Sequence, residues 1–171
     1  MTTIYLIRHA EAEGNLYRRI HGWYDALVTE NGWKQIQALE TRFAGVPVDA
    51  VWSSDLYRTC ATARAVYVPR GMELHTDPDL REINMGRWED RTWGEVRQTE
   101  GERLLQFNHS DPAWVAPGGV QNTRTFYYNR FRRKSQCFSA TSGKITGEYA
   151  VFSEKSSTRT KNKKPRQIKS A

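Results

Sequence analysis

The sequence predicts an α/β domain with a largely parallel β-sheet. Two observations support this class. Short apolar runs alternate along the chain with segments whose apolar residues recur every three or four positions, and such an alternation of strands and helices is typical of α/β domains. In addition, an arginine and a histidine follow directly after the first apolar run, and another arginine comes shortly after the second. These are the strand ends where open α/β sheets bind their ligands.

The first strand is predicted over residues 4–7, because IYLI is apolar at consecutive positions, as in a strand covered on both faces. A helix is predicted next, from Thr29, a residue type that caps helix N-termini, to a stop at Gly45. Four apolar residues at spacings of three and four are expected on the core face of this helix: Trp33, Ile36, Leu39 and Phe43.

The same pattern then repeats. AVW predicts a second strand over 50–52, and Asp55 is expected to cap a helix that ends at Pro69. A third short strand is predicted near 72–76. The run TWGE has the spacing of a capping box and predicts a last helix over 92–105.

The functional signal lies just beyond the predicted strands. Arg8 and His9 follow the first strand directly, and Arg58 comes shortly after the second. Because the carboxyl ends of parallel strands meet at one edge of a sheet, we expect two arginines and one histidine to share that edge.

Five stretches carry a resemblance to a known family. In order, they are LIRHAEAEGN, RRIHGWYDALVTENGWKQ, SSDLYRTCATA, LREINMGRWEDRTW and APGG, and together they span about residues 2–119. Their order and spacing resemble the histidine phosphatase superfamily, the phosphoglycerate mutase-like enzymes. The usual glycine after the histidine is Ala10 here. The resemblance implies a three-layer α/β/α sandwich with a mostly parallel sheet.

The resemblance also implies a site. His9 would attack phosphorus and become a phosphohistidine, because a neutral imidazole is available near pH 7. Arg8 and Arg58 would hold the phosphoryl oxygens in their guanidinium forks. Glu82 would protonate the leaving oxygen and then activate water. Further residues would face a small phosphorylated substrate: Asn15, His21 and Gly22. We expect no metal and no cofactor.

The residues after Glu82 bear on the reaction. Mutases of this family place an arginine directly after the acid and then a long insertion, whereas Ile83 and GRWEDRTW follow here. This is similar to the phosphatase-type members, so we expect phosphomonoester hydrolysis. Phosphoglycerate mutase-type phosphoryl transfer and an inactive phosphate-binding relative are the alternatives.

The character of the chain changes after Gly119. Residues 1–118 contain 13 Lys and Arg against 17 Asp and Glu, a net charge of −4, whereas residues 119–171 contain 13 against two, a net charge of +11. We therefore divide the chain into a histidine phosphatase domain over 1–119 and a basic tail over 120–171. We expect this tail to be non-native or disordered, which would leave the core without a central strand and a helix.

The tail also lacks a residue that the resemblance requires. The family brings a second histidine to the site from a strand next to the first, but the four histidines here lie at 9, 21, 75 and 109. We therefore expect weakened activity. A frameshift or gene truncation after Gly119 is our hypothesis, and a search of the alternative reading frames for a histidine-bearing strand would test it.

Composition sets the remaining expectations. No apolar stretch approaches the ~20 residues of a membrane span, and two cysteines form no disulfide framework, so we expect a cytoplasmic protein. The basic tail with its aromatic residues is an alternative nucleic-acid-binding segment. We do not favour that alternative, because no recognised nucleic-acid-binding fold accompanies it. The sequence does not indicate the oligomeric state.

Overall fold

A computed structural model describes residues 2–107, 114–120 and 149–155. Four strands and four α-helices are joined by short 3₁₀ helices. In chain order they are β1 (Thr2–Arg8), α1 (Glu13–Leu16), α2 (Glu30–Phe43), β2 (Ala50–Ser53), α3 (Tyr57–Tyr67), η1 (Val68–Arg70), β3 (Leu74–Thr76), η2 (Pro78–Leu80), η3 (Gly86–Trp88), α4 (Trp93–Leu105) and β4 (Tyr149–Lys155). The fold is α/β, as predicted, but two of the three described strand pairings, those of β4, are antiparallel where a mostly parallel sheet was expected.

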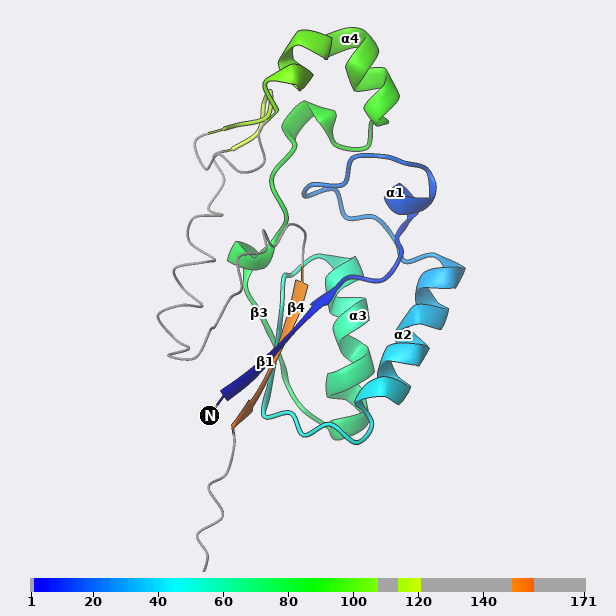
Figure 1. Ribbon diagram of the computed structural model, residues 1–171, viewed down its shortest axis with the longest axis vertical. Helices are drawn as coiled ribbons and strands as arrows, with labels where there is room; N and C mark the ends of the chain where they lie inside the picture. The colour runs from blue at the N-terminus through cyan, green and yellow to red at the C-terminus, as the bar shows by residue number, and fades with distance from the viewer. Residues whose placement is uncertain (1, 108–113, 121–148, 156–171) are drawn as a thin grey trace, which may run out of the picture.

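The sheet has the strand order β1-β4-β2-β3. β2 and β3 pair in parallel, with Val51 opposite Leu74. β4 pairs antiparallel with both of its neighbours and places Tyr149 opposite Arg8. β1, β2 and β3 therefore run in one direction, and their carboxyl ends reach the same edge of the sheet (Figure 1).

β4 corrects one prediction about the basic tail. We expected the core to lack a central strand, but Tyr149–Lys155 lies between β1 and β2. The prediction was wrong for this segment because it rested on the polar and basic composition of the whole tail, whereas YAVF over 149–152 is apolar at consecutive positions, as IYLI is, and pairs with a strand on each side. The remaining predictions for 120–171 fall on residues outside those that the structure describes.

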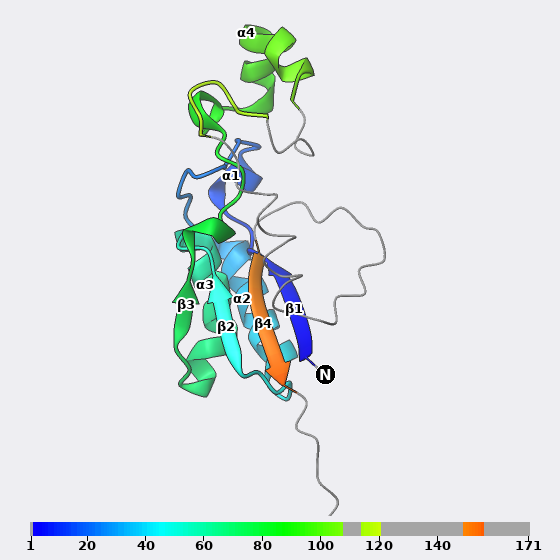
Figure 2. The same ribbon diagram turned by 90° about the vertical axis from the view of Figure 1, so that its left-hand side faces the viewer.

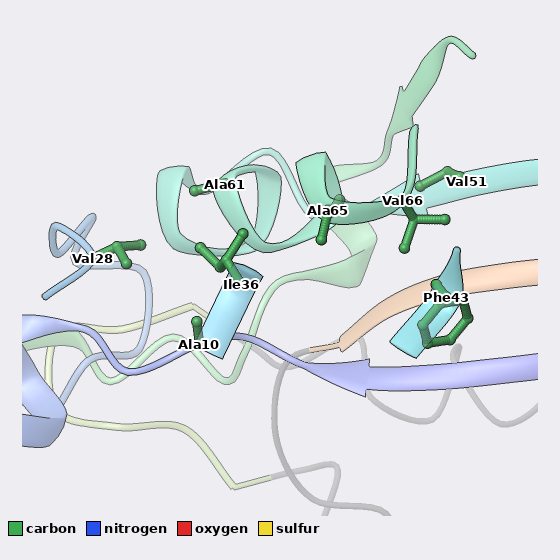
Figure 3. Close-up of a cluster of buried hydrophobic side chains, with 9 residues drawn as sticks. Ala10, Val28, Ile36, Phe43, Val51, Ala61, Ala65 and Val66 are labelled. Atoms are coloured by element: carbon green, nitrogen blue, oxygen red, sulfur yellow. The ribbon is translucent and has the colours of Figure 1, made fainter. Parts of the chain in front are cut away.

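The long helices α2 and α3 cover one face of the sheet (Figure 2). We call the buried residues between them and the sheet the sheet cluster (Figure 3): Ala10, Val28, Ile36, Phe43, Val51, Ala61, Ala63, Ala65 and Val66. Three of these residues are alanines of α3, and their small side chains let the helix pack closely against its neighbours. The second helix layer of the predicted three-layer sandwich is not seen among the described residues.

A second apolar group lies beyond the carboxyl edge of the sheet. We call it the cap cluster: Ile20, Ile83, Met85, Trp88 and Val96. Partly buried Leu104, Phe107 and Trp114 pack against it, and Figure 1 shows its helix α4 at the end of the molecule away from the sheet. Loops, a 3₁₀ helix and α4 build this cluster without any strand.

Two of the three predicted capping residues, Thr29 and Thr92, are confirmed. Thr29 precedes α2, and its side chain accepts a hydrogen bond from the amide of Gly32 at 3.0 Å. Thr92 opens α4 with both arms of a capping box, accepting from the amide of Glu95 at 3.1 Å while its own amide donates to the Glu95 carboxylate.

Two details of the helices differ from the predictions. Asp55 does not cap α3, because the carboxylate of Asp25 accepts from the amide of Tyr57 at 2.7 Å and Asp55 instead binds Arg81. Trp33 does not join the core face of α2, since 42% of it is exposed. No helix in the described part of the chain is both long and apolar enough to cross a membrane.

Candidate functional site

Two strand ends meet at the site. His9 follows the last residue of β1, and Arg58 lies in the first turn of α3, five residues after the end of β2. Ser53 and Ser54, which begin the turn between β2 and α3, are fully buried. The turn is held by a 2.8 Å hydrogen bond between the hydroxyls of Ser54 and Thr59.

Thr62 links these two strand ends. Its hydroxyl accepts a hydrogen bond from the amide of Ala10 at 2.8 Å and donates one to the carbonyl of Arg58 at 2.7 Å. Thr62 is 2% exposed, so neither bond competes with water. One buried hydroxyl thus ties the loop that carries His9 to the helix turn that carries Arg58.

The His9 ring is oriented by the neighbouring main chain. Nδ1 lies 2.7 Å from the carbonyl oxygen of Ala10, which can only accept, so Nδ1 carries the proton and the neutral ring keeps a lone pair on Nε2. Burial, with smaller effects from the charges of Arg58 and Arg8, lowers the pKa of His9 to about 4, against the opposing effect of the Ala10 hydrogen bond. His9 is therefore neutral at pH 7.

His21 lies beside His9. The ring centroids are 5.8 Å apart with an interplanar angle of 70°. Burial, with smaller effects from Arg58, His9 and Arg8, lowers the pKa of His21 to about 4. Its Nε2 is buried with no hydrogen-bond partner among the described residues. The ring lies so close to the main chain of Gly14 that a Cβ there would be 1.9 Å from Nε2.

Arg58 holds the loop that follows His21. The side chain is 1% exposed, and its two terminal nitrogens donate to the carbonyls of Tyr24 at 2.7 Å and Gly22 at 2.8 Å. Gly22 has a φ of +51°, and a Cβ there would lie 2.4 Å from the Glu89 carboxylate. A side chain at position 22 would therefore be strained and would also clash.

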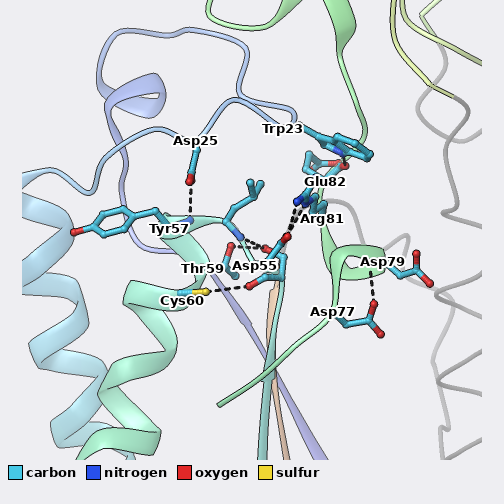
Figure 4. Close-up of polar contacts among 12 residues, drawn as sticks. Trp23, Asp25, Asp55, Tyr57, Thr59, Cys60, Asp77, Asp79, Arg81 and Glu82 are labelled. Atoms are coloured by element: carbon cyan, nitrogen blue, oxygen red, sulfur yellow. Dashed lines mark hydrogen bonds and ion pairs between the residues drawn. The ribbon is translucent and has the colours of Figure 1, made fainter. Parts of the chain in front are cut away.

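Glu82 reaches this loop through Trp23. The Trp23 indole donates to the Glu82 carbonyl at 2.9 Å, and the Trp23 amide donates to the Glu89 carboxylate at 2.8 Å. The carboxylate of Glu82 accepts from the amide of Ile83 at 2.8 Å. Figure 4 shows Glu82 next to Trp23 and Arg81, above the end of β2.

The predicted site residues are thus grouped unevenly. His9 and His21 lie side by side, and Arg8 and Arg58 are close enough for their charges to lower the pKa of both histidines. Gly22 joins this group through its carbonyl. Asn15 instead accepts from the amide of Ala12 at 2.9 Å in the first turn of α1, and it is exposed.

Sequence reasoning missed three contributors to this geometry. Gly14 and Thr62 lie inside stretches that the resemblance covers. Their residue types alone do not indicate that Gly14 makes room for the His21 ring or that Thr62 links the His9 loop to α3. Arg81 is adjacent to Glu82 in the chain, and this adjacency was the available signal. No group of three or more possible metal ligands occurs among the described residues.

A family model for the histidine phosphatase superfamily (branch 1) matches residues 4–151. The chain belongs to this superfamily. The match continues past Gly119, the boundary that we predicted from composition, and ends within β4.

Several members of the superfamily are similar to this chain. Probable phosphoglycerate mutase GpmB of Yersinia pestis (strain Pestoides F) is 41% identical over 119 residues, which cover 69% of this chain and 55% of the relative. The protein of the same name from Proteus mirabilis (strain HI4320) is 41% identical over 91 residues, covering 53% and 42%. The chain therefore spans about half the length of these curated relatives.

Solved structures show the same fold. The alpha-ribazole phosphatase of Shigella flexneri matches with a TM-score of 0.66 and 28% identity, covering 78% of this chain and 66% of that one. Within the described part of this superfamily member, the strand beside β1 is the antiparallel β4, which carries no histidine. The histidine next to His9 is His21, from the loop after α1.

Proposed function

We propose that this chain hydrolyses phosphomonoesters through a phosphohistidine on His9. The observation that carries the proposal is the placement of His9, neutral and with a lone pair on Nε2, beside Arg8, Arg58 and His21. A neutral imidazole is a nucleophile at pH 7, and nearby guanidinium groups bind the dianionic phosphoryl group that it would attack.

The reaction has two steps. Nε2 of His9 attacks phosphorus, the bond from phosphorus to the ester oxygen breaks, and Glu82 gives its proton to that oxygen. Glu82 then takes a proton from water as the water oxygen attacks phosphorus. The P–N bond breaks, and inorganic phosphate leaves. Arg8 and Arg58 hold the phosphoryl oxygens in both steps, because charge builds up there in each transition state.

The substrate is a small phosphorylated molecule. We propose that Asn15, His21 and Gly22 face it, and the proximity of His21 to His9 supports this for His21. We also propose that the reaction takes place in the cytoplasm. Among the described residues no strand brings a second histidine to the site, and loss of one preorganised group typically slows catalysis by about 10²–10³. We therefore expect slow turnover.

A second candidate is phosphoryl transfer of the mutase type. The names of the Yersinia and Proteus relatives favour it, whereas the Shigella structure favours phosphatase chemistry. A mutase would convert one phosphoglycerate isomer to the other with little phosphate release. A phosphatase would release phosphate and form no isomer, so one incubation with 3-phosphoglycerate separates the two.

The decisive experiment uses the full chain with p-nitrophenyl phosphate and the variant His9→Asn. We expect slow release of p-nitrophenol by the unmodified chain and none by the variant. Quenching with a ³²P-labelled ester should leave acid-labile label on His9. Saturable phosphate binding without label would instead show an inactive phosphate-binding relative, and this outcome would overturn the proposal.

A further inference from the structure

Arg81 makes an unusual set of contacts next to the proposed acid. It lies at the C-terminal end of η2, immediately before Glu82. Its guanidinium binds the Asp55 carboxylate with two parallel hydrogen bonds, one of them from Nε to Oδ1 at 2.6 Å and the other from the terminal nitrogen to Oδ2. Both side chains are largely shielded, with exposures of 25% and 31%. The bonds to Arg81 hold the pKa of Asp55 below its usual value.

The same guanidinium also packs on an aromatic ring. Its carbon atom lies 4.7 Å from the centroid of the Trp23 ring, which is within the range of a cation–π interaction. The edge of that indole donates to the carbonyl of Glu82. Trp23 therefore contacts both residues of the Arg81–Glu82 pair (Figure 4).

Both partners of Arg81, Asp55 and Trp23, lie close to Arg58. Asp55 follows the buried serines at the end of β2, three residues before Arg58. Trp23 follows Gly22, whose carbonyl accepts from Arg58. Two sets of contacts therefore hold the main chain at Glu82. One runs through Arg81 to Asp55, three residues before Arg58, and the other runs through Trp23 to Gly22, whose carbonyl accepts from Arg58.

We infer that Arg81 is a positioning residue for Glu82. Clamped between Asp55 and Trp23, it sets the place of the acid relative to His9 and Arg58. A lysine could not replace it fully, because an ammonium offers no planar fork for the carboxylate and no flat face for the indole. This inference rests on the proposed function of Glu82 as the acid.

The test compares two substrates of different leaving-group basicity. Nitrophenolate leaves without needing a proton, whereas the alkoxide of glycerol 2-phosphate needs one, so misplacement of the acid affects mainly the second substrate. For Arg81→Gln we expect kcat on glycerol 2-phosphate to fall about 10-fold to 100-fold, with a much smaller change on p-nitrophenyl phosphate. Arg81→Lys should recover part of this loss.

Arg91→Gln is the matched control. Arg91 also binds a carboxylate, that of Glu100 at 3.1 Å, with a similar exposure of 31%, but it lies beside α4. Its substitution should affect both substrates alike. Equal losses on both substrates for Arg81→Gln would overturn the inference, because a merely structural role has that signature.

A second measurement does not depend on activity. Hydrogen exchange at the Ile83 amide and the Trp23 indole should accelerate in Arg81→Gln and stay unchanged in Arg91→Gln. Unchanged exchange at both positions in Arg81→Gln overturns the inference even if the enzyme is active. Accelerated exchange supports it even if the unmodified chain fails to hydrolyse esters, a result that would count against the proposed function alone.

Discussion

The sheet cluster and the cap cluster hold the two halves of the candidate site in different ways. The sheet cluster packs two regular helices on strands, and it supports His9 and Arg58 through the ends of β1 and the start of α3. The cap cluster packs loops and α4 around the fully buried Trp88, and it includes Ile83, the neighbour of Glu82. The nucleophile and the acid therefore depend on separate apolar cores.

The segment after α1 joins the two clusters. Ile20 is buried in the cap cluster, and its amide and carbonyl bond to the main chain at Arg91 and Asp90, at 2.8 and 2.9 Å. Two residues later, the carbonyl of Gly22 accepts from Arg58. The spacing between the proposed acid and nucleophile thus depends on a few residues of loop, which is the weakest point of the arrangement.

The largest expected effect comes from emptying the cap cluster. Trp88→Ala should lower the free energy of opening of the cap by about 3–5 kcal/mol, because it leaves a large cavity. Hydrogen exchange should speed up at the amides of α4 and much less at those of α3. Phe43→Ala, with a similar cost in the sheet cluster, is the control and should speed up exchange at the amides of α3 more than at those of α4. Equal acceleration in α3 and α4 for Trp88→Ala would show that the two clusters unfold as one unit.

A smaller effect is expected where His21 meets the main chain. Gly14→Ala places a Cβ against the His21 ring and should destabilise the fold by about 1–3 kcal/mol, the usual cost of overpacking. It should also displace His21 from His9. Denaturant unfolding measures the first effect, and a changed titration of the His9 ring in NMR spectra measures the second. Wild-type values in both experiments would mean that the close approach does not constrain the site.

The two histidines predict a pH dependence of stability. Burial lowers the pKa of both to about 4 in the folded chain, whereas unfolded histidine titrates near 6.5. Between these values the unfolded chain binds protons that the folded chain does not, so stability should fall as the pH decreases from about 6.5 toward 4. Chemical denaturation across this range measures it, and His21→Gln should make the slope shallower. An unchanged slope in His21→Gln would mean that His21 titrates normally in the fold.

The smallest effect compares the two capping threonines. Thr92→Ala and Thr29→Ala should each cost about 1 kcal/mol, the first in the helix of the cap cluster and the second in α2. If the clusters are separate, each change should accelerate hydrogen exchange mainly in its own helix. Spread of either effect to the other helix would argue against the comparison.

Sequence alone was informative for the sheet cluster and much less so for the cap. Regular periodicity predicted α2, consecutive apolar residues predicted the first two strands, and the capping box predicted α4. The buried Trp88 lies in a 3₁₀ helix of three residues, which is too short to show a regular spacing of apolar residues. Arg81 was missed for a related reason, since its partners Asp55 and Trp23 are distant in sequence.

β4 shows a different limit. Its position depends on pairing with β1 and β2, which precede it by about a hundred residues or more, and no local pattern encodes such a long-range contact. The site residues adjacent to strand ends were easier to group, because the rule that strand ends gather in α/β folds brought Arg8, His9 and Arg58 together. Whether the reading frame changes after Gly119 stays a prediction.

The hydroxyl of Thr62 has a mechanical consequence. The hydroxyl is hydrogen-bonded both to the amide of Ala10 and to the carbonyl of Arg58. A small displacement of α3 along the sheet would therefore also move the loop that carries His9. The distance between the His9 imidazole and the Arg58 guanidinium would then stay nearly constant during thermal motion of α3. Thr62→Val keeps the shape of the side chain but removes both hydrogen bonds. The distance between His9 and Arg58, on which phosphoryl binding depends, would then vary more with thermal motion.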